Sequence, residues 1–315
     1  MILVTGVSGG LGGLIFRGLS GEDGLDVVGG TRSGDGVSAR RIDFDDPASL
    51  AAGFRGVDVL VFVSAGYAED DVVLARHGAV VDAAEAAGVR HVVYTSLAGS
   101  GSLMTIALPH RWTEARLAEA AFEVTVLRNG LYAEVPLGLA AVAAASAAGT
   151  GVFAAAFGAG RVSVVAKEDL ADVAVRVVAE IQNDLVAGRR NRHAGRTYEL
   201  EGVEAFGGQD LAEVLGEALG RPVGYQPISL FSTRETLAGS GLEPYRITHT
   251  LSLFANLNAG YLHAPDTDLT ALLPTGPRLV RDQIIQAVKA AHGGLMPGRP
   301  ARDEPGSGRS APVVR

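Results

Sequence analysis

Short apolar runs alternate with segments of helical periodicity along the first 130 residues. The apolar runs predict β-strands at Ile2–Val4, Leu25–Gly30, Arg41–Phe44, Val57–Ser64, His91–Ser96 and Glu123–Leu127. The intervening segments predict α-helices that end at Leu19 and cover Pro47–Phe54, Asp71–Ala87 and Trp112–Ala121. Such alternation is typical of an α/β protein with a doubly wound parallel sheet, whose ligands bind at the carboxyl ends of the strands.

Beyond Gly130 the alternation becomes irregular. The pattern there predicts helices over Leu137–Ala148, Glu168–Glu180, Asp210–Leu219, Leu230–Ala238 and Tyr245–Asn256, and strands at Val162–Val165, Thr197–Leu200 and Val223–Gln226. We therefore expect a cofactor-binding domain over residues 1–200 and a smaller α+β substrate-binding lobe over residues 201–292, with residues 131–160 contributing to that lobe. Residues 293–315 are rich in glycine, proline, arginine and serine, which predicts a disordered tail.

A glycine-rich stretch follows the first predicted strand and opens the first helix. Gly6, Gly9 and Gly12 have the spacing G-x-x-G-x-x-G. In a dinucleotide-binding turn the first glycine permits a tight bend, the second lets the backbone approach a pyrophosphate, and the third lets the helix pack closely on the strand. The helix N-terminus then faces the pyrophosphate. We predict a cofactor cradle that also includes Ser8, Gly10 and Leu11; the alternative is a glycine-rich turn without a ligand.

The end of the second strand indicates which dinucleotide binds. It carries Arg32 and no carboxylate, and an arginine there suits the 2′-phosphate of NADPH, whereas NAD prefers an acidic residue. The alternative for Arg32 is a solvated surface charge. Asp43 follows the third strand, where it could lie beside the adenine or cap a helix. The fourth strand ends in three small residues, Ser64, Ala65 and Gly66. Small residues are needed where the chain passes close to the cofactor.

Composition narrows the choice of function. A net charge of −8 gives no support for binding nucleic acid or an anionic membrane surface. The chain has no cysteine, which excludes disulfides and thiolate metal sites and is compatible with the cytoplasm. Its seven histidines lack metal-binding spacing, so we predict no metal. Residues 137–160 are uncharged, but alanine and glycine dominate them, which favours a buried helix over a membrane span.

Several motifs together carry a family resemblance. They are the N-terminal TGVSGGLGG, Thr31–Arg32, the stretch Tyr94–Leu97, His110-x-x-Thr113–Glu114, and Leu127–Arg128–Asn129–Gly130 followed by Tyr132. With these the chain resembles NmrA-like atypical short-chain dehydrogenases/reductases, and among them bacterial NADPH-dependent quinone oxidoreductases. The resemblance runs to about Val288 and is strongest before Tyr132. It implies a Rossmann fold with a small C-terminal lobe, NADPH as cofactor, and hydride transfer to a quinone or carbonyl compound.

The chain departs from the wider superfamily at the site of proton donation. Members usually carry Tyr-x-x-x-Lys about thirteen residues after a serine of the fifth strand. If Ser96 is that serine, the corresponding stretch, residues 109–114, has neither the tyrosine nor the lysine. His110 is then the candidate acid, because the ordinary pKa of histidine lies near neutrality; the alternative is an idle residue at a helix start.

The other candidates lie at predicted strand ends. Ser96 could bond a substrate oxygen or the nicotinamide ribose, or only end its strand. Tyr132 could stack on a planar substrate or donate its hydroxyl, or join the two lobes. We expect Thr95 and Asn129 beside the cofactor, and Lys167 to be solvated rather than bound to it.

A quinone needs less catalytic help than a ketone, because hydride transfer gives a stabilised hydroquinone anion. The main hypothesis is therefore a cytoplasmic NADPH-dependent oxidoreductase acting on a small, planar quinone or conjugated carbonyl compound. One alternative is a non-catalytic, NmrA-like redox sensor that binds a dinucleotide and acts through a protein partner. Another is a tailoring reductase or isomerase of a biosynthetic pathway.

Overall fold

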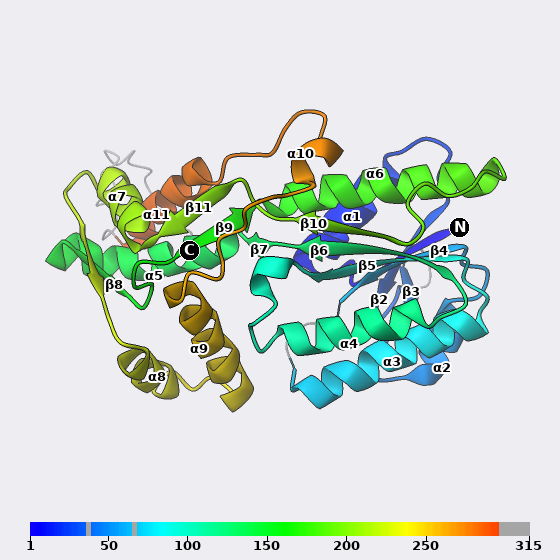
Figure 1. The fold of residues 1–315 in the computed structure, drawn as a ribbon, viewed down its shortest axis with the longest axis horizontal. Helices are drawn as coiled ribbons and strands as arrows, with labels where there is room; N and C mark the ends of the chain where they lie inside the picture. The colour runs from blue at the N-terminus through cyan, green and yellow to red at the C-terminus, as the bar shows by residue number, and fades with distance from the viewer. Residues whose placement is uncertain (36–38, 65–67, 296–315) are drawn as a thin grey trace, which may run out of the picture.

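The computed structural model describes residues 1–35, 39–64 and 68–295 and is built around a seven-stranded parallel sheet (Figure 1). The strand order is β10-β6-β5-β4-β1-β2-β3, and every neighbouring pair is parallel. This arrangement confirms the predicted α/β class with a doubly wound sheet. The strands are β1 (Ile2–Thr5), β2 (Val27–Thr31), β3 (Ala39–Arg41), β4 (Val59–Val63), β5 (His91–Leu97), β6 (Glu123–Asn129) and β10 (Arg196–Leu200).

Helices cover both faces of this sheet because its strands present apolar side chains on both sides. In β1, Ile2 and Val4 enter one buried cluster and Leu3 enters the other, as strand alternation requires. One face carries α1 (Gly10–Ser20) and α6 (Lys167–Val186). The opposite face carries α2 (Pro47–Gly53), α3 (Asp70–Ala86) and α4 (Ala107–Ala118).

A second lobe lies beyond the carboxyl ends of the strands (Figure 1). In its core the Ala-rich helix α5 (Glu134–Thr150) packs against α7 (Gly208–Leu219) and α11 (Arg281–Leu295). Ala140, Ala144 and Ala147 of α5 are fully buried there. The lobe also contains β8 (Val152–Ala155), β12 (Gly224–Pro227), α8 (Leu230–Ala238) and α9 (Pro244–Asn258). A small sheet of β7 (Leu131–Tyr132), β9 (Arg161–Val165) and β11 (Glu204–Gly207) lies between the two parts. The turn η1 (Gly99–Gly101) and α10 (Leu269–Leu272) complete the described elements.

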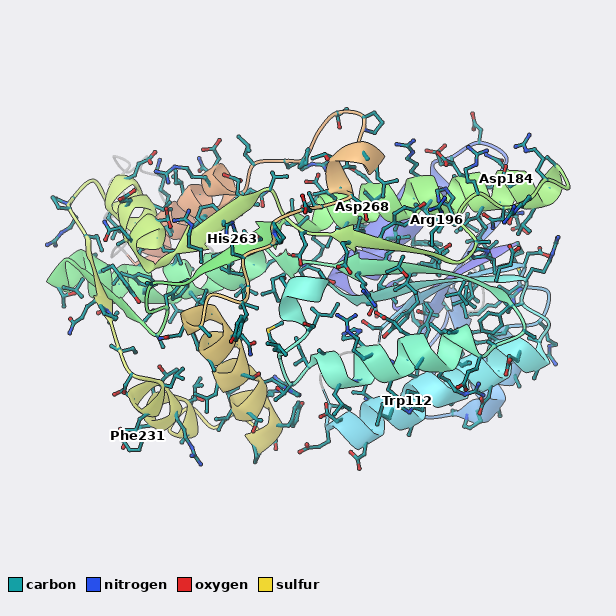
Figure 2. All side chains as sticks on the ribbon, in the orientation of Figure 1. Trp112, Asp184, Arg196, Phe231, His263 and Asp268 are labelled. Atoms are coloured by element: carbon teal, nitrogen blue, oxygen red, sulfur yellow. The ribbon has the colours of Figure 1, made fainter. Side chains whose placement is uncertain are left out.

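The uncharged stretch over residues 137–160 therefore supplies packing surface to the second lobe. In the described part of the chain, no helix is both long and apolar enough to cross a bilayer. Figure 2 labels residues on opposite sides of the molecule. Asp184 and Arg196 lie on the side of the amino ends of the strands, and Phe231 lies at the periphery of the second lobe.

Several predicted boundaries differ from the structure by a few residues, α6 for example continuing to Val186 beyond the predicted Glu180, and three differences have a local reason. The third strand is Ala39–Arg41 rather than Arg41–Phe44, because residues after Ile42 turn into α2, which Asp46 caps. Helix α4 begins at Ala107, five residues early, because Pro109 occupies its first turn, where no intrahelical N–H bond is needed. Helix α11 continues to Leu295, so the predicted tail does not begin at residue 293; residues 296–315 lie outside the described chain.

The glycine stretch holds α1 close to β1. Gly6 has a φ of +65°, which glycine adopts without strain. A Cβ on Gly12 would lie 2.4 Å from the carbonyl oxygen of Gly6, so only glycine fits there. Thr5 joins this turn to β4, since its hydroxyl accepts a hydrogen bond from the Val63 amide at 2.9 Å.

We predict that Gly12→Ala lowers the free energy of unfolding by about 2–3 kcal/mol, because the added methyl meets backbone atoms that cannot move independently. Urea denaturation measures this change. Gly138→Ala in α5 is the matched control, since no described atom from elsewhere in the fold lies within 4 Å of its added Cβ, and it should be neutral or stabilising. Equal unfolding free energies for the two variants would contradict the packing role of Gly12.

Candidate active site

The first component of the site is an exposed cradle at the N-terminus of α1. Ser8, Gly9 and Gly10 are exposed, and the amide of Gly9 donates to the Gly6 carbonyl at 2.9 Å, which fixes the bend. Within the described part of the chain no side chain caps α1, so its first N–H groups and positive dipole end remain available to an anion. The cradle therefore fits the diphosphate of a dinucleotide, and Gly6, Gly9, Gly10, Leu11 and Gly12 lie where the sequence predicts them.

The second component is a cavity of about 350 Å³ at the carboxyl ends of β4, β5 and β6. Six of the predicted residues line it: Ser64, Thr95, Ser96, His110, Asn129 and Tyr132. Val63 also lines the cavity and lies against Gly6, so the cavity and the cradle are direct neighbours. The apolar remainder of the wall includes Val73, Leu97, Ile106, Leu131 and Val135.

His110 projects from the first turn of α4 and is held from behind by a buried tyrosine. The hydroxyl oxygen of Tyr94 lies 3.0 Å from Nδ1 of His110. Burial lowers the pKa of His110 to about 4, so its imidazole is neutral at physiological pH. Burial also raises the pKa of Tyr94, which stays protonated. The predicted acid therefore differs from an ordinary histidine: at neutral pH it offers a neutral N–H group and not an imidazolium.

A second histidine, His77 of α3, also lines the cavity. Its Nδ1 lies 2.7 Å from the hydroxyl of Thr113, which donates in turn to the carbonyl of Pro109. Burial lowers the pKa of His77 to about 3. Since the hydroxyl proton of Thr113 is already used, Nδ1 of His77 is the donor in this contact.

The carboxylate of Glu114 joins the two motifs that carry the family resemblance. Arg128 donates to it from Nε at 3.0 Å and from Nη2 at 2.6 Å, and Arg111 donates at 2.9 Å. The hydroxyl of Ser96 donates to the same carboxylate. Burial works to raise the pKa of Glu114, but the hydrogen bonds from Arg128 and Ser96 outweigh it and hold the pKa below its usual value.

The hydroxyl proton of Ser96 is consequently used in its hydrogen bond to Glu114. Ser96 lines the cavity as predicted, but it faces a ligand as an acceptor only. A hydrogen bond from Ser96 to a substrate oxygen would require its hydroxyl to leave Glu114, whereas a ribose hydroxyl could still donate to it, so the role of Ser96 stays a prediction. Thr95, in contrast, accepts from the amide of Ser64 at 3.0 Å, and among the described residues no acceptor binds its own hydroxyl proton.

Tyr132 closes the side of the cavity nearest the cradle. Burial raises its pKa, which makes the phenol a weaker acid than usual. Nζ of Lys167 lies 5.2 Å from the centre of its ring and forms an ion pair with Glu134. Lys167 is therefore paired and largely covered, contrary to the prediction of a solvated side chain.

The remaining cofactor candidates lie outside the cavity. Arg32 is exposed at the end of β2, close enough to Asp45 to lower the pKa of that carboxyl, although Arg76 lowers it more. The carboxylate of Asp43 accepts from the amide of Asp45 and lies 3.5 Å from Arg41, and Asp46 caps α2 instead. Ala65 and Gly66 lie outside the described residues. The roles of Arg32 and Asp43 toward the cofactor stay predictions.

Helix α9 of the second lobe covers the cavity from the other side. His249 lines the cavity, and its Nδ1 lies 2.7 Å from the hydroxyl of Thr105. The amide of Thr105 donates to Ser252 at 3.0 Å. These bonds join α9 to the segment that precedes α4, so the second lobe shapes the space in front of His110.

A doubly wound sheet with a glycine cradle beside a cavity defines a dinucleotide-binding protein of the Rossmann type. Known proteins extend this conclusion. A family model described as NAD(P)H-binding matches residues 6–181. Quinone oxidoreductase 2 of Escherichia coli (strain K12) is 32% identical over 252 residues, which are 77% of this chain and 82% of that protein. The NAD(P)H azoreductase of Xenophilus azovorans is 28% identical over 247 residues, 78% of each chain.

Solved structures agree with these relatives. The E. coli NADPH-dependent quinone oxidoreductase in complex with NADPH has a TM-score of 0.78 at 28% identity, covering 91% of this chain and 99% of that one. The Citrobacter sp. triphenylmethane reductase in complex with NADP(H) has a TM-score of 0.77 at 26% identity, with coverages of 92% and 99%. The chain belongs to the NAD(P)H-binding family, and its predicted NmrA-like type and NADP(H) cofactor are confirmed. It is an NAD(P)H-dependent oxidoreductase.

Sequence reasoning missed several residues that the fold brings to the site. They are Tyr94 behind the cavity, His77 and His249 in its wall, and Lys167 with Glu134 beside the cradle. Tyr94 lies within a recognised motif, which was a usable signal. The others contact the site through pairs distant in sequence, and no local pattern marks them. Within the described chain, no cluster of metal-ligating side chains is present.

We predict that Arg32→Ala weakens NADPH binding about 10-fold to 100-fold and leaves NADH binding nearly unchanged, because only NADPH carries the 2′-phosphate. Titration of cofactor fluorescence measures both dissociation constants. Arg40→Ala is the control, since Arg40 donates to the carbonyls of Gly53 and Arg55 and is engaged with the protein. A similar loss for both dinucleotides would show that Arg32 does not contact the 2′-phosphate.

Proposed function

We propose that this oxidoreductase uses NADPH to reduce quinones or closely related planar, conjugated acceptors. The observation that carries the proposal is the neutral His110 in a mainly apolar cavity beside the cofactor cradle. An apolar cavity suits a flat aromatic acceptor, and a neutral donor such as His110 suits an acceptor whose reduced form needs little stabilisation. We also propose that the reaction takes place in the cytoplasm, with which the absence of cysteine is compatible.

The cofactor would be held by this chain's own groups at three places. The backbone of Gly9 and Gly10 would receive the diphosphate, Arg32 the 2′-phosphate, and Thr95 with Asn129 the part nearest the cavity. When bound, NADPH supplies the hydride that the acceptor takes up. Positioning the acceptor against it in a water-poor cavity then provides much of the catalysis.

His110 would stabilise the anion formed when a quinone takes up the hydride. We propose that Tyr94 donates to Nδ1, which places the imidazole proton on Nε2 and directs an N–H group at the acceptor oxygen. The quinone gains two electrons and one hydrogen from the cofactor, and the anion then takes a proton from water to become the hydroquinone. A simple ketone gives an alkoxide, a much stronger base, and would need the acid that residues 109–114 lack.

The relatives support this choice of acceptor. They are named for activity toward quinones, azo compounds and triphenylmethane dyes. These compounds share an extended conjugated system that delocalises the charge gained on reduction. The apolar wall of this cavity and the neutral state of His110 match that shared property.

The direct test is oxidation of NADPH by the purified protein with benzoquinones, naphthoquinones, an azo dye and an aliphatic ketone, followed by absorbance of the reduced nicotinamide. We expect turnover with the quinones, one NADPH consumed per hydroquinone formed, and no turnover with the ketone. Reduction of the ketone at a similar rate would contradict the proposal. Cofactor binding without oxidation by any acceptor would contradict it as well and would favour a sensor.

The role of His110 predicts a distinctive pH dependence. Because the pKa of His110 is about 4, its imidazole stays neutral above that value, and kcat should be constant between about pH 5.5 and 8. Protonation near pH 4 keeps the N–H group on Nε2 and adds a positive charge, so hydride transfer should become faster rather than slower as the pH approaches 4. His110→Leu should lower kcat about 10-fold to 100-fold, whereas His110→Gln keeps an N–H donor and should lose less. An inflection near pH 6.5 that His110→Leu abolishes would instead show an ordinary, titrating histidine.

A further inference from the structure

Lysine is rare in this chain, and one of its two lysines lies at the cofactor cradle. The 27 basic residues comprise 25 arginines, Lys167 and Lys289. Lys289 is exposed on α11. Lys167 is the first residue of α6, directly beyond β9, at the same edge of the molecule as the start of α1. Its position beside the cradle, and not only its charge, suggests a role in binding the cofactor.

The side chain of Lys167 extends from the start of α6 to the start of α1. A Cβ placed on Gly10 would lie 3.1 Å from Nζ of Lys167 and 3.3 Å from its Cδ, so the ammonium lies directly against the first residue of α1. On its other side it lies over the ring of Tyr132, which lines the cavity. Lys167 is therefore located between the phosphate cradle and the cavity.

The electrostatics of this position are unfavourable without an anion. The N-terminus of a helix carries a partial positive charge, and a cation there is normally destabilising. Lys167 adds its charge at the N-termini of two helices, α6 and α1. The ion pair with Glu134 offsets it. Glu134 is half exposed, whereas the side chain of Lys167 is 21% exposed, so the carboxylate is the more accessible and more easily exchanged partner.

We propose that Lys167 is a cofactor-binding residue whose ammonium binds the diphosphate of NAD(P)H at the N-terminus of α1, and that Glu134 holds the ammonium in place until the cofactor displaces it. This proposal rests on NAD(P)H binding by the family and not on the identity of the acceptor. The diphosphate is common to NADPH and NADH, so Lys167 serves both dinucleotides equally. It thereby differs from Arg32, whose predicted partner is the 2′-phosphate.

The first experiment measures dissociation constants for NADPH and NADH by calorimetry with five proteins: wild type, Lys167→Ala, Glu134→Gln, the double variant, and Lys289→Ala as the matched lysine control. We expect Lys167→Ala to weaken both dinucleotides about 10-fold to 100-fold, because a charge-assisted bond to phosphate is lost. Glu134→Gln removes the competitor and should tighten binding several-fold. In the double variant the effect of Glu134→Gln should disappear, and Lys289→Ala should bind like the wild type.

The second experiment follows the amines themselves. Reductive methylation with mass spectrometry reports the reactivity of Lys167 and Lys289 in one protein, in the presence and absence of NADP⁺. We expect the cofactor to protect Lys167 and to leave Lys289 unchanged. This readout needs no turnover, and thermal unfolding of each variant confirms that the fold is intact.

The outcomes separate failure of this proposal from failure of cofactor binding. Wild-type affinity of Lys167→Ala for both dinucleotides, or equal labelling of Lys167 with and without cofactor, would overturn the proposal while leaving NAD(P)H binding in place. A loss confined to NADPH would also overturn it, because it would place Lys167 at the 2′-phosphate. Absence of binding by the wild type would instead contradict the cofactor assignment itself.

Discussion

The carboxylate of Glu114 is the interaction on which the geometry of the cavity depends. It receives hydrogen bonds from Arg128 of β6 and Ser96 of β5, so it holds α4 against the carboxyl ends of two central strands. His110 lies one turn earlier on the same helix, and its position in the cavity follows from this attachment. Removing Arg128 would leave Arg111 as the remaining ion-pair partner of this partly buried carboxylate, which is more costly than losing an exposed ion pair. The two family motifs thus occur together because their side chains meet.

Local signals predicted the sheet and the cradle well, because both follow from short-range rules. Three glycines after an apolar run specify the turn, and the β-branched runs specify buried parallel strands. Helix α4 was harder, since Pro109 looks like a breaker and is tolerated only because it falls in the first turn. The state of His110 could not be predicted at all: its pKa depends on how completely α3, α4 and β5 cover it, and this is a property of packing.

The same reasoning explains why Lys167 escaped prediction. A lysine at the start of a helix has no local pattern, and its partner Glu134 belongs to a helix of the other lobe. Likewise, nothing near Ser96 in the sequence shows that its proton goes to Glu114. Residue type and position at a strand end identified the neighbourhood of the site correctly. The direction of each hydrogen bond, which decides the chemistry, came only from the tertiary structure.

Two parts of the chain contribute to the site, and the hydrogen bonds from α9 to Thr105 join them. The cradle and the proton donor are built from the first 135 residues and the start of α6, whereas His249 comes from a helix more than a hundred residues later. Substitutions in α9 can therefore reshape the space for the acceptor while the groups that hold the cofactor stay unchanged. Selection can act on the two requirements independently, so proteins that share this scaffold can diverge in the compounds they reduce and still draw on the same cellular reductant.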